Sequence, residues 1–107
     1  MVRPLAQPDV FTAIADPTRR RLVDLLREGD RSVTDLARDF AVSVAAISQH
    51  LRVLREVGVV KVEQSGRQRF YRLQPEALQP VHDWVAVYRQ FWEERFDALD
   101  RHLKENE

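Results

Sequence analysis

The side chains best suited to chemistry in this chain lie within residues 43–57, whose spacing predicts an amphipathic helix. On its polar face, Gln49 can form two hydrogen bonds with adenine, and Arg52 can form two with guanine. Ser48 and His50 lie at the edges of this face, where short donors suit phosphates or base edges. The chemistry that these residues support together is hydrogen bonding to a nucleic acid.

The start and the opposite face of the same helix fit this chemistry. Ser43 can cap the helix, whose free N–H groups then favour a phosphate, and Ala45 is small enough to touch a thymine methyl group. Apolar residues recur on the opposite face, and we expect all of them to be buried: Val44, Ile47, Leu51 and Leu54. The alternative is an ordinary surface helix whose donors contact only water.

Two strand-like segments with a basic tip follow this helix. We predict strands at residues 59–64 and 68–73, joined by a turn in which Gly66 can adopt a positive φ. Arg67 and Arg69 flank the turn, where they can reach phosphates or a narrow minor groove. Alternatively, they are solvated charges that protect a strand edge from aggregation. A helix rich in donors followed by a basic hairpin is the order of elements in a winged helix-turn-helix.

Other helices must position these segments. Residues 9–15 and 17–27 are predicted helices, and Asp16 between them can cap the second. Ser32 can cap a short third helix, and a long helical pattern follows from Pro75. The predicted fold class is therefore mainly α with a small β-hairpin, in the order four helices, two strands and a last helix.

Length and charge bound the function further. The chain has 107 residues, which predicts one domain over 1–107, and its 17 basic residues balance its 17 acidic ones. Residues 1–73 contain 13 basic and 9 acidic residues, whereas residues 74–107 contain 4 and 8. The basic excess thus lies on the part that carries the predicted DNA-contacting helix and hairpin, where an electrostatic footprint is expected.

Several classes of function lack their motifs. There is no cysteine, so disulfides and thiolate metal sites are excluded. The sequence contains no phosphate-binding glycine loop and no nucleophile motif, and we expect neither an enzyme nor a cofactor. Residues 1–7 lack the apolar core of a signal peptide, and no stretch approaches the roughly 20 apolar residues of a membrane span. We therefore expect a cytoplasmic protein without membrane contact.

Four segments, in this order and at these separations, resemble the ArsR/SmtB family of bacterial winged-helix repressors. They are Ile14-Ala15-Asp16-Pro17-Thr18-Arg19-Arg20-Arg21-Leu22, Ser32-Val33-Thr34-Asp35-Leu36-Ala37, residues 43–54 with their core Ser48-Gln49-His50-Leu51, and Leu54-Arg55-Glu56-Val57-Gly58-Val59-Val60. The resemblance implies a homodimer formed by the first and last helices, a fourth helix in the major groove and a palindromic operator in double-stranded DNA. The helix-turn-helix would span about residues 32–57, the wing about 59–73, and the dimerisation helices about 8–15 and 76–103. The residues expected to contact DNA are Ser43, Ala45, Ser48, Gln49, His50, Arg52, Arg67 and Arg69.

The last helix carries an apolar face too wide for a helix that contacts only its own small domain. Together with the first helix, this face supplies the expected dimer interface: Val10, Phe11, Ile14, Trp84, Tyr88, Phe91, Trp92 and Leu99. The aromatic residues could instead line a ligand pocket, although aromatic stripes at helical spacing are more often core.

Departures from the family pattern bear on metal sensing. Many members bind metals through cysteines of the third helix, and others through Asp and His of the last helix together with a second pair further along. The remaining candidates here are His82, Asp83, Asp100 and His102, and the chain ends before a second pair could occur. We therefore expect no metal site and place the chain nearer the branch without one.

The predicted function is a dimeric repressor that binds an inverted repeat. One alternative is a zinc-responsive derepressor that uses the last helix, and another is a winged helix used only for contact with proteins. The sequence does not identify an inducer, which could be a small molecule or a metal.

Overall fold

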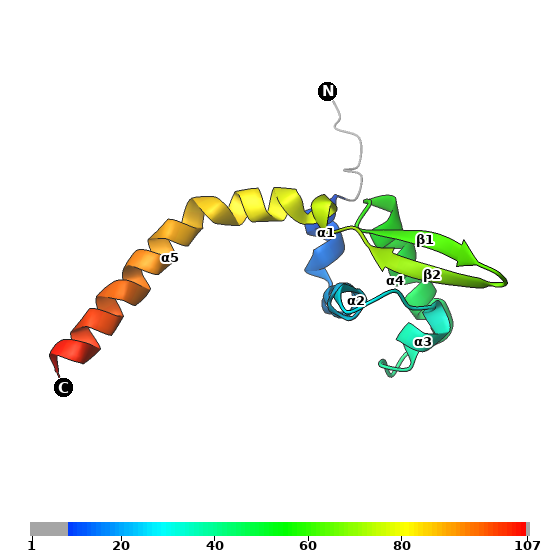
Figure 1. The fold of residues 1–107 in the computed structure, drawn as a ribbon, viewed down its shortest axis with the longest axis horizontal. Coiled ribbons are helices and arrows are strands. Elements are labelled where there is room, and N and C mark those ends of the chain that lie inside the picture. The colour runs from blue at the N-terminus through cyan, green and yellow to red at the C-terminus, as the bar shows by residue number, and fades with distance from the viewer. Residues whose placement is uncertain (1–8, 107) are drawn as a thin grey trace, which may run out of the picture.

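The computed structural model describes residues 9–106 and confirms the predicted fold class, with helices and one antiparallel hairpin in the expected order (Figure 1). The elements are α1 (Val10–Ala15), α2 (Pro17–Arg27), α3 (Val33–Ala37), α4 (Val44–Glu56), β1 (Val60–Ser65), β2 (Gln68–Leu73), the 3₁₀ helix η1 (Pro75–Leu78) and α5 (Gln79–Glu105). The predicted dimerisation helix that begins at residue 8, and residues 1–7 with their expected lack of a signal peptide, lie partly or wholly outside the described residues.

Side-chain caps determine where the first four helices begin. Asp16 accepts a hydrogen bond from the backbone N–H of Arg19 at 3.0 Å, as the sequence predicts for the start of α2. Ser32 and Ser43 accept equivalent bonds at the starts of α3 and α4, so both predicted caps are confirmed. Asp9 also caps α1. These short polar side chains satisfy backbone N–H groups that a helix leaves without partners.

The core lies among α1, α2, α3, α4 and the start of β1, and we call residues 10–73 the head. Its largest fully buried side chains are Leu22, Leu36, Ile47, Leu51, Leu54, Val59 and Val60. Three of the four apolar residues predicted on the inner face of α4 are therefore confirmed as core. The prediction for Val44 is wrong, because this side chain is 45% exposed. It occupies the first turn of α4, and the preceding residues 41–43 are also exposed and do not cover it.

The hairpin pairs Val60 with Leu73 and Ser65 with Gln68, so the first strand begins and ends one residue later than predicted. Gly66 has a φ of +63° in the turn, which confirms its predicted conformation. At the base of the hairpin, the backbone of Tyr71 also forms an isolated antiparallel bridge with Arg31, between α2 and α3. The hairpin is therefore attached to the helical part on the outer side of β2.

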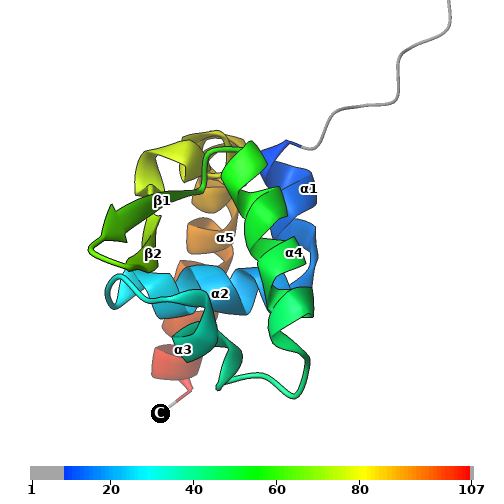
Figure 2. The ribbon, with the colours of Figure 1, turned by 90° about the vertical axis from the view of Figure 1, so that its right-hand side faces the viewer.

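The helix α5 differs from the four α-helices before it, because none of its residues is buried. In Figure 1 it runs away from the head as a long arm, and Figure 2 shows the head from the other end with α5 behind it. None of the helices within residues 9–106 combines the length and the apolar character that crossing a membrane requires.

Candidate nucleic-acid interface

The helix α4 presents the predicted donors on the side away from the core. Ser43, Ala45 and Gln49 are exposed, and Ser48 is half-buried at the edge of this face. The side chain of Arg52 is 74% exposed, and its Nε lies 3.3 Å from the Glu56 carboxylate one turn later. An exposed i,i+4 pair of this kind contributes only a few tenths of a kcal/mol, about 0.3–0.5. Arg52 can therefore exchange its intramolecular partner for a base or a phosphate at little cost.

His50 lies differently from the other predicted DNA contacts. Its side chain is half-buried, with Nδ1 3.2 Å from a guanidinium nitrogen of Arg19 and 3.9 Å from an oxygen of Asp16. The same guanidinium donates to the backbone carbonyls of Ala13, at 2.6 Å, and Thr12, at 3.3 Å. His50 thus joins α4 to the junction of α1 and α2, and its contact with DNA stays a prediction.

The wing divides its cations between base and tip. At the base, Arg72 contacts Asp30 at 2.8 Å and Glu63 at 3.0 Å, and Lys61 contacts Glu63 at 3.1 Å. Within residues 9–106, Arg67 and Arg69 at the tip form neither an ion pair nor a side-chain hydrogen bond, and both are exposed. Within the wing, the positive charge that is available for a polyanion is therefore concentrated at the tip, where the sequence predicts DNA contact.

The tip also borders a surface groove that the sequence analysis did not predict. This groove, about 470 Å³ in volume, lies between α3 and the wing. Its polar lining includes Thr34 of α3, Arg38 at the end of that helix, and Arg67 and Arg69 of the wing. Local patterns carry no signal for this neighbourhood, because the two segments are about 30 residues apart and only the folded chain brings them together.

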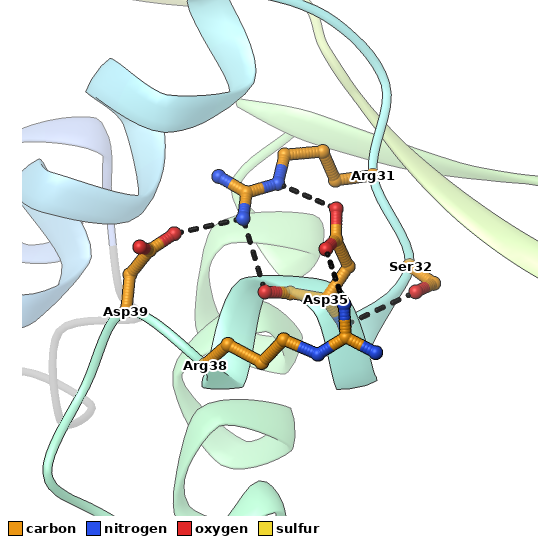
Figure 3. Close-up of polar contacts among 5 residues, drawn as sticks. All are labelled: Arg31, Ser32, Asp35, Arg38 and Asp39. Atoms are coloured by element: carbon orange, nitrogen blue, oxygen red, sulfur yellow. Dashed lines mark hydrogen bonds and ion pairs between the residues drawn. The ribbon is translucent and has the colours of Figure 1, made fainter.

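An ion network joins the residue before the cap of α3 to the helix and to the residues that follow it (Figure 3). Arg31 Nε lies 2.8 Å from Asp35 Oδ2, and Arg31 Nη2 lies 2.7 Å from Asp39 Oδ2 and 3.0 Å from the Asp35 carbonyl oxygen. The hydrogen bonds to Asp35, and then to Asp39, raise the pKa of Arg31, and the bond from Arg31 lowers the pKa of Asp35. Arg38 lies 3.4 Å from the other oxygen of Asp35. Arg31 therefore stays charged at neutral pH.

The predicted dimer residues fall into two groups. Val10 is buried in the core of the head, which leaves little of its surface for a partner, and Ile14 is half-buried. Phe11 is exposed on α1 and packs edge-on against Trp84, which in turn packs against Tyr88. Exposed apolar side chains continue along α5: Trp84, Val87, Tyr88, Phe91, Trp92, Phe96, Leu99 and Leu103. We call this surface the α5 apolar face. Within the described residues, Phe11 contacts Trp84 and the Arg95 guanidinium lies 4.4 Å from the centre of the Phe91 ring, but most of the face stays exposed.

The candidate metal ligands on α5 have local partners instead. His82 Nδ1 lies 3.1 Å from the carboxylate of the adjacent Asp83. Asp100 forms an ion pair with Lys104, in which Oδ2 and Nζ are 3.1 Å apart. His102 Nε2 lies 3.1 Å from the Asn106 side chain. Among residues 9–106, no group of three or more His, Cys, Asp or Glu residues is arranged to hold a metal ion.

Comparison of the sequence with known proteins identifies similarity to bacterial regulators. The profile of the family described as bacterial regulatory protein, arsR family, matches residues 16–62. The transcriptional repressor SdpR of Bacillus subtilis is 39% identical over 80 residues, which cover 75% of this chain and 89% of the repressor. The HTH-type transcriptional regulator Rv2034 of Mycobacterium tuberculosis is 44% identical over 72 residues, which cover 66% of this chain and 67% of that regulator.

Solved structures agree with the sequence comparison. The crystal structure of a possible transcriptional regulator for arsenical resistance has a TM-score of 0.65 and 45% identity. The match covers 90% of this chain and 94% of that one, so it includes the head and most of α5.

Proposed function

Because the chain belongs to the bacterial ArsR family, and is thus a DNA-binding transcriptional regulator rather than an enzyme, we propose that it is a homodimeric repressor of an inverted-repeat operator. The observation that carries this proposal is the pairing of two exposed surfaces in one chain. One is the row of donors on α4 together with the cationic tip of the wing, and the other is the α5 apolar face.

A second copy is the partner that best fits the α5 apolar face. Eight large apolar side chains of α5 are at least 47% exposed, which is more than a soluble monomer of this size usually leaves in one contiguous surface. The aromatic contacts from Phe11 through Trp84 to Tyr88 already join α1 to α5 within the chain. Two such surfaces related by a two-fold axis cover each other, because an isologous interface uses the same patch on both subunits.

The two-fold axis sets how the dimer binds DNA. Two α4 helices enter successive major grooves with their centres about 34 Å apart, and each contacts one half of an inverted repeat. In each half, Gln49 and Ser48 contact base edges, and Arg52 contacts a base or a phosphate. Ser43 and Arg67 contact the backbone. Binding at a promoter then represses transcription by excluding the polymerase. Because the DNA of a bacterium lies in its cytoplasm, the protein acts there.

Selection of bound duplexes from a random DNA pool tests this proposal. We expect an enriched inverted repeat whose half-sites lie one helical turn apart, with affinity that falls steeply as salt increases. Enrichment of a single, unrepeated half-site would contradict the dimer on DNA. Failure to shift any duplex at low salt would instead favour a winged helix that contacts only proteins.

A further inference from the structure

We propose that Asp30 and Arg31, in the loop between α2 and α3, position the wing for DNA through Arg72 and Tyr71 of β2. This inference rests on the proposed contact of Arg67 with DNA. It assigns a function to the wing-base contacts, by which we mean the bonds of Asp30 and Arg31 to β2 and to α3. These residues are positioning residues, because they act on DNA through the wing tip.

Arg31 connects the wing to α3 by its backbone and its side chain together. Its backbone N–H donates to the Tyr71 carbonyl at 3.2 Å, and its own carbonyl accepts from the Tyr71 N–H at 2.8 Å. Its guanidinium reaches in the other direction to Asp35 within α3 and to Asp39 just after α3 ends (Figure 3). A rotation of the wing relative to α3 therefore breaks either the backbone bridge or the ion pairs.

Arg72 connects the same loop to both strands. Its Nε and Nη2 donate to one oxygen of Asp30 at 2.9 and 2.8 Å, and its Nη1 donates to Glu63 of β1 at 3.0 Å. Asp30 and Arg72 are 42 residues apart in the sequence, so this contact exists only in the folded chain. Together with the bridge at Arg31, it holds the base of the hairpin at two consecutive loop residues.

The strength of these contacts suits orientation better than overall stability. About half of the Arg72 side chain is exposed, and exposed ion pairs contribute about 0–1 kcal/mol to folding. A two-stranded hairpin, however, is only marginally stable by itself. Val60, Tyr71 and Leu73 attach its base to the core, and the contacts of Arg31 and Arg72 add polar restraints on its direction. Arg67 lies about 16 Å along the strand from Arg72, so a rotation of about 10° at the base moves the tip by about 3 Å. That displacement is as long as a hydrogen bond to a phosphate.

A double-mutant cycle separates this role from a direct contact of Arg72 with DNA. Binding of a fluorescent duplex with the selected inverted repeat is measured for Arg72→Met, Arg67→Ala and the double variant. We expect Arg72→Met to lower the affinity roughly fivefold to tenfold in the natural background, and less than about twofold when Arg67 is already Ala. Equal losses in both backgrounds would overturn the proposal, because Arg72 would then act independently of the tip.

Two further variants distinguish positioning from folding and from failure of the proposed function. Asp30→Ala removes the loop partner of Arg72 and keeps every cation of the wing, so it should lower affinity to a similar extent as Arg72→Met, while the thermal midpoint stays within a few degrees throughout. A stable Asp30→Ala variant that binds as tightly as the natural protein would overturn the proposal, as would a loss of affinity that only follows loss of folded protein. If Arg67→Ala alone leaves affinity unchanged, the proposed DNA contact of the wing fails, and this inference fails with it. If Arg67→Ala weakens binding but its effect adds to that of Arg72→Met, only this inference fails.

Discussion

The head and α5 differ in the exposure of their apolar side chains. In the head, Leu22, Ile47 and Leu51 are completely buried within one chain. In α5, Trp84 is 59% exposed and Phe96 is 69% exposed, and no residue of the helix is buried. The head thus has its own core, whereas α5 has an apolar surface without a core, and we propose that a second copy of the chain covers it.

Charge follows the same division. Residues 1–73 carry a net charge of +4 and residues 74–107 a net charge of −4. The acidic side chains of α5 are repelled by phosphates, and the cations at the wing tip are attracted to them. We therefore expect substitutions at the wing tip to change DNA affinity without changing self-association.

The largest effect is expected from a cavity in the head. Leu51→Ala should lower the free energy of unfolding by about 2–5 kcal/mol, because it removes buried methyl groups from a packed core. Urea denaturation at two protein concentrations measures this loss, which should be similar at both. A loss of less than about 1 kcal/mol would show that the head is not the independently packed unit described here.

The next largest effect concerns α5. Trp92→Ala should weaken dimerisation by about 2–4 kcal/mol, because large aromatic residues dominate protein interfaces. Sedimentation equilibrium measures the dissociation constant, and Asp97→Ala, at an exposed acidic position of the same helix, serves as the control. Equal constants for the two variants would place the interface elsewhere.

A smaller effect, confined to DNA, is expected at α4. Arg52→Ala should weaken specific DNA binding by about 1–3 kcal/mol if Arg52 pairs with guanine. The oligomeric state should not change, and the stability of the fold should change little. Arg55→Ala, which removes an exposed arginine outside the predicted contact set, is the matched control in a fluorescence titration. Equal losses on selected and scrambled duplexes would assign Arg52 to a phosphate.

The smallest effect concerns the junction of α1 and α2. Asp16→Ala should lower stability by about 1 kcal/mol at neutral pH, because it removes the cap of α2. The backbone hydrogen bond from Arg19 lowers the pKa of Asp16 below 3.8, so its stabilising effect is complete above that value. The stabilising effect of the carboxylate should disappear as the pH falls through 3.8, the pKa in the unfolded chain, and then through the lower pKa of Asp16 in the folded protein.

Urea denaturation at pH 7 and near pH 3 measures this effect of acid. The difference between the natural protein and Asp16→Ala should shrink at the lower pH. Asp16→Asn keeps an acceptor that does not titrate and is the control. A difference that stays constant with pH would contradict the assignment to the carboxylate.

Local features of the fold followed from the sequence. Asp16, Ser32 and Ser43 begin helices as predicted, because a cap depends on residues within one turn of it. The second strand has the predicted bounds, and Gly66 occupies the turn. The buried face of α4 was also predictable, because its periodicity reports which residues face the core.

Features that depend on contacts between distant segments could not be predicted from the sequence. The exposure of Val44 depends on what covers the first turn of α4, which periodicity cannot tell. His50 lies against Arg19, 31 residues earlier, and no local pattern indicates that contact. The same holds for Asp30 with Arg72 and for the groove between α3 and the wing. The DNA contacts and the dimer interface stay predictions.

Sedimentation equilibrium of the unmodified protein without DNA tests the central claim most directly, since that claim is that a second copy covers the α5 apolar face. At micromolar concentrations and physiological salt, we expect a mass twice that of one 12.6 kDa chain. A mass of 12.6 kDa over the whole concentration range would contradict it.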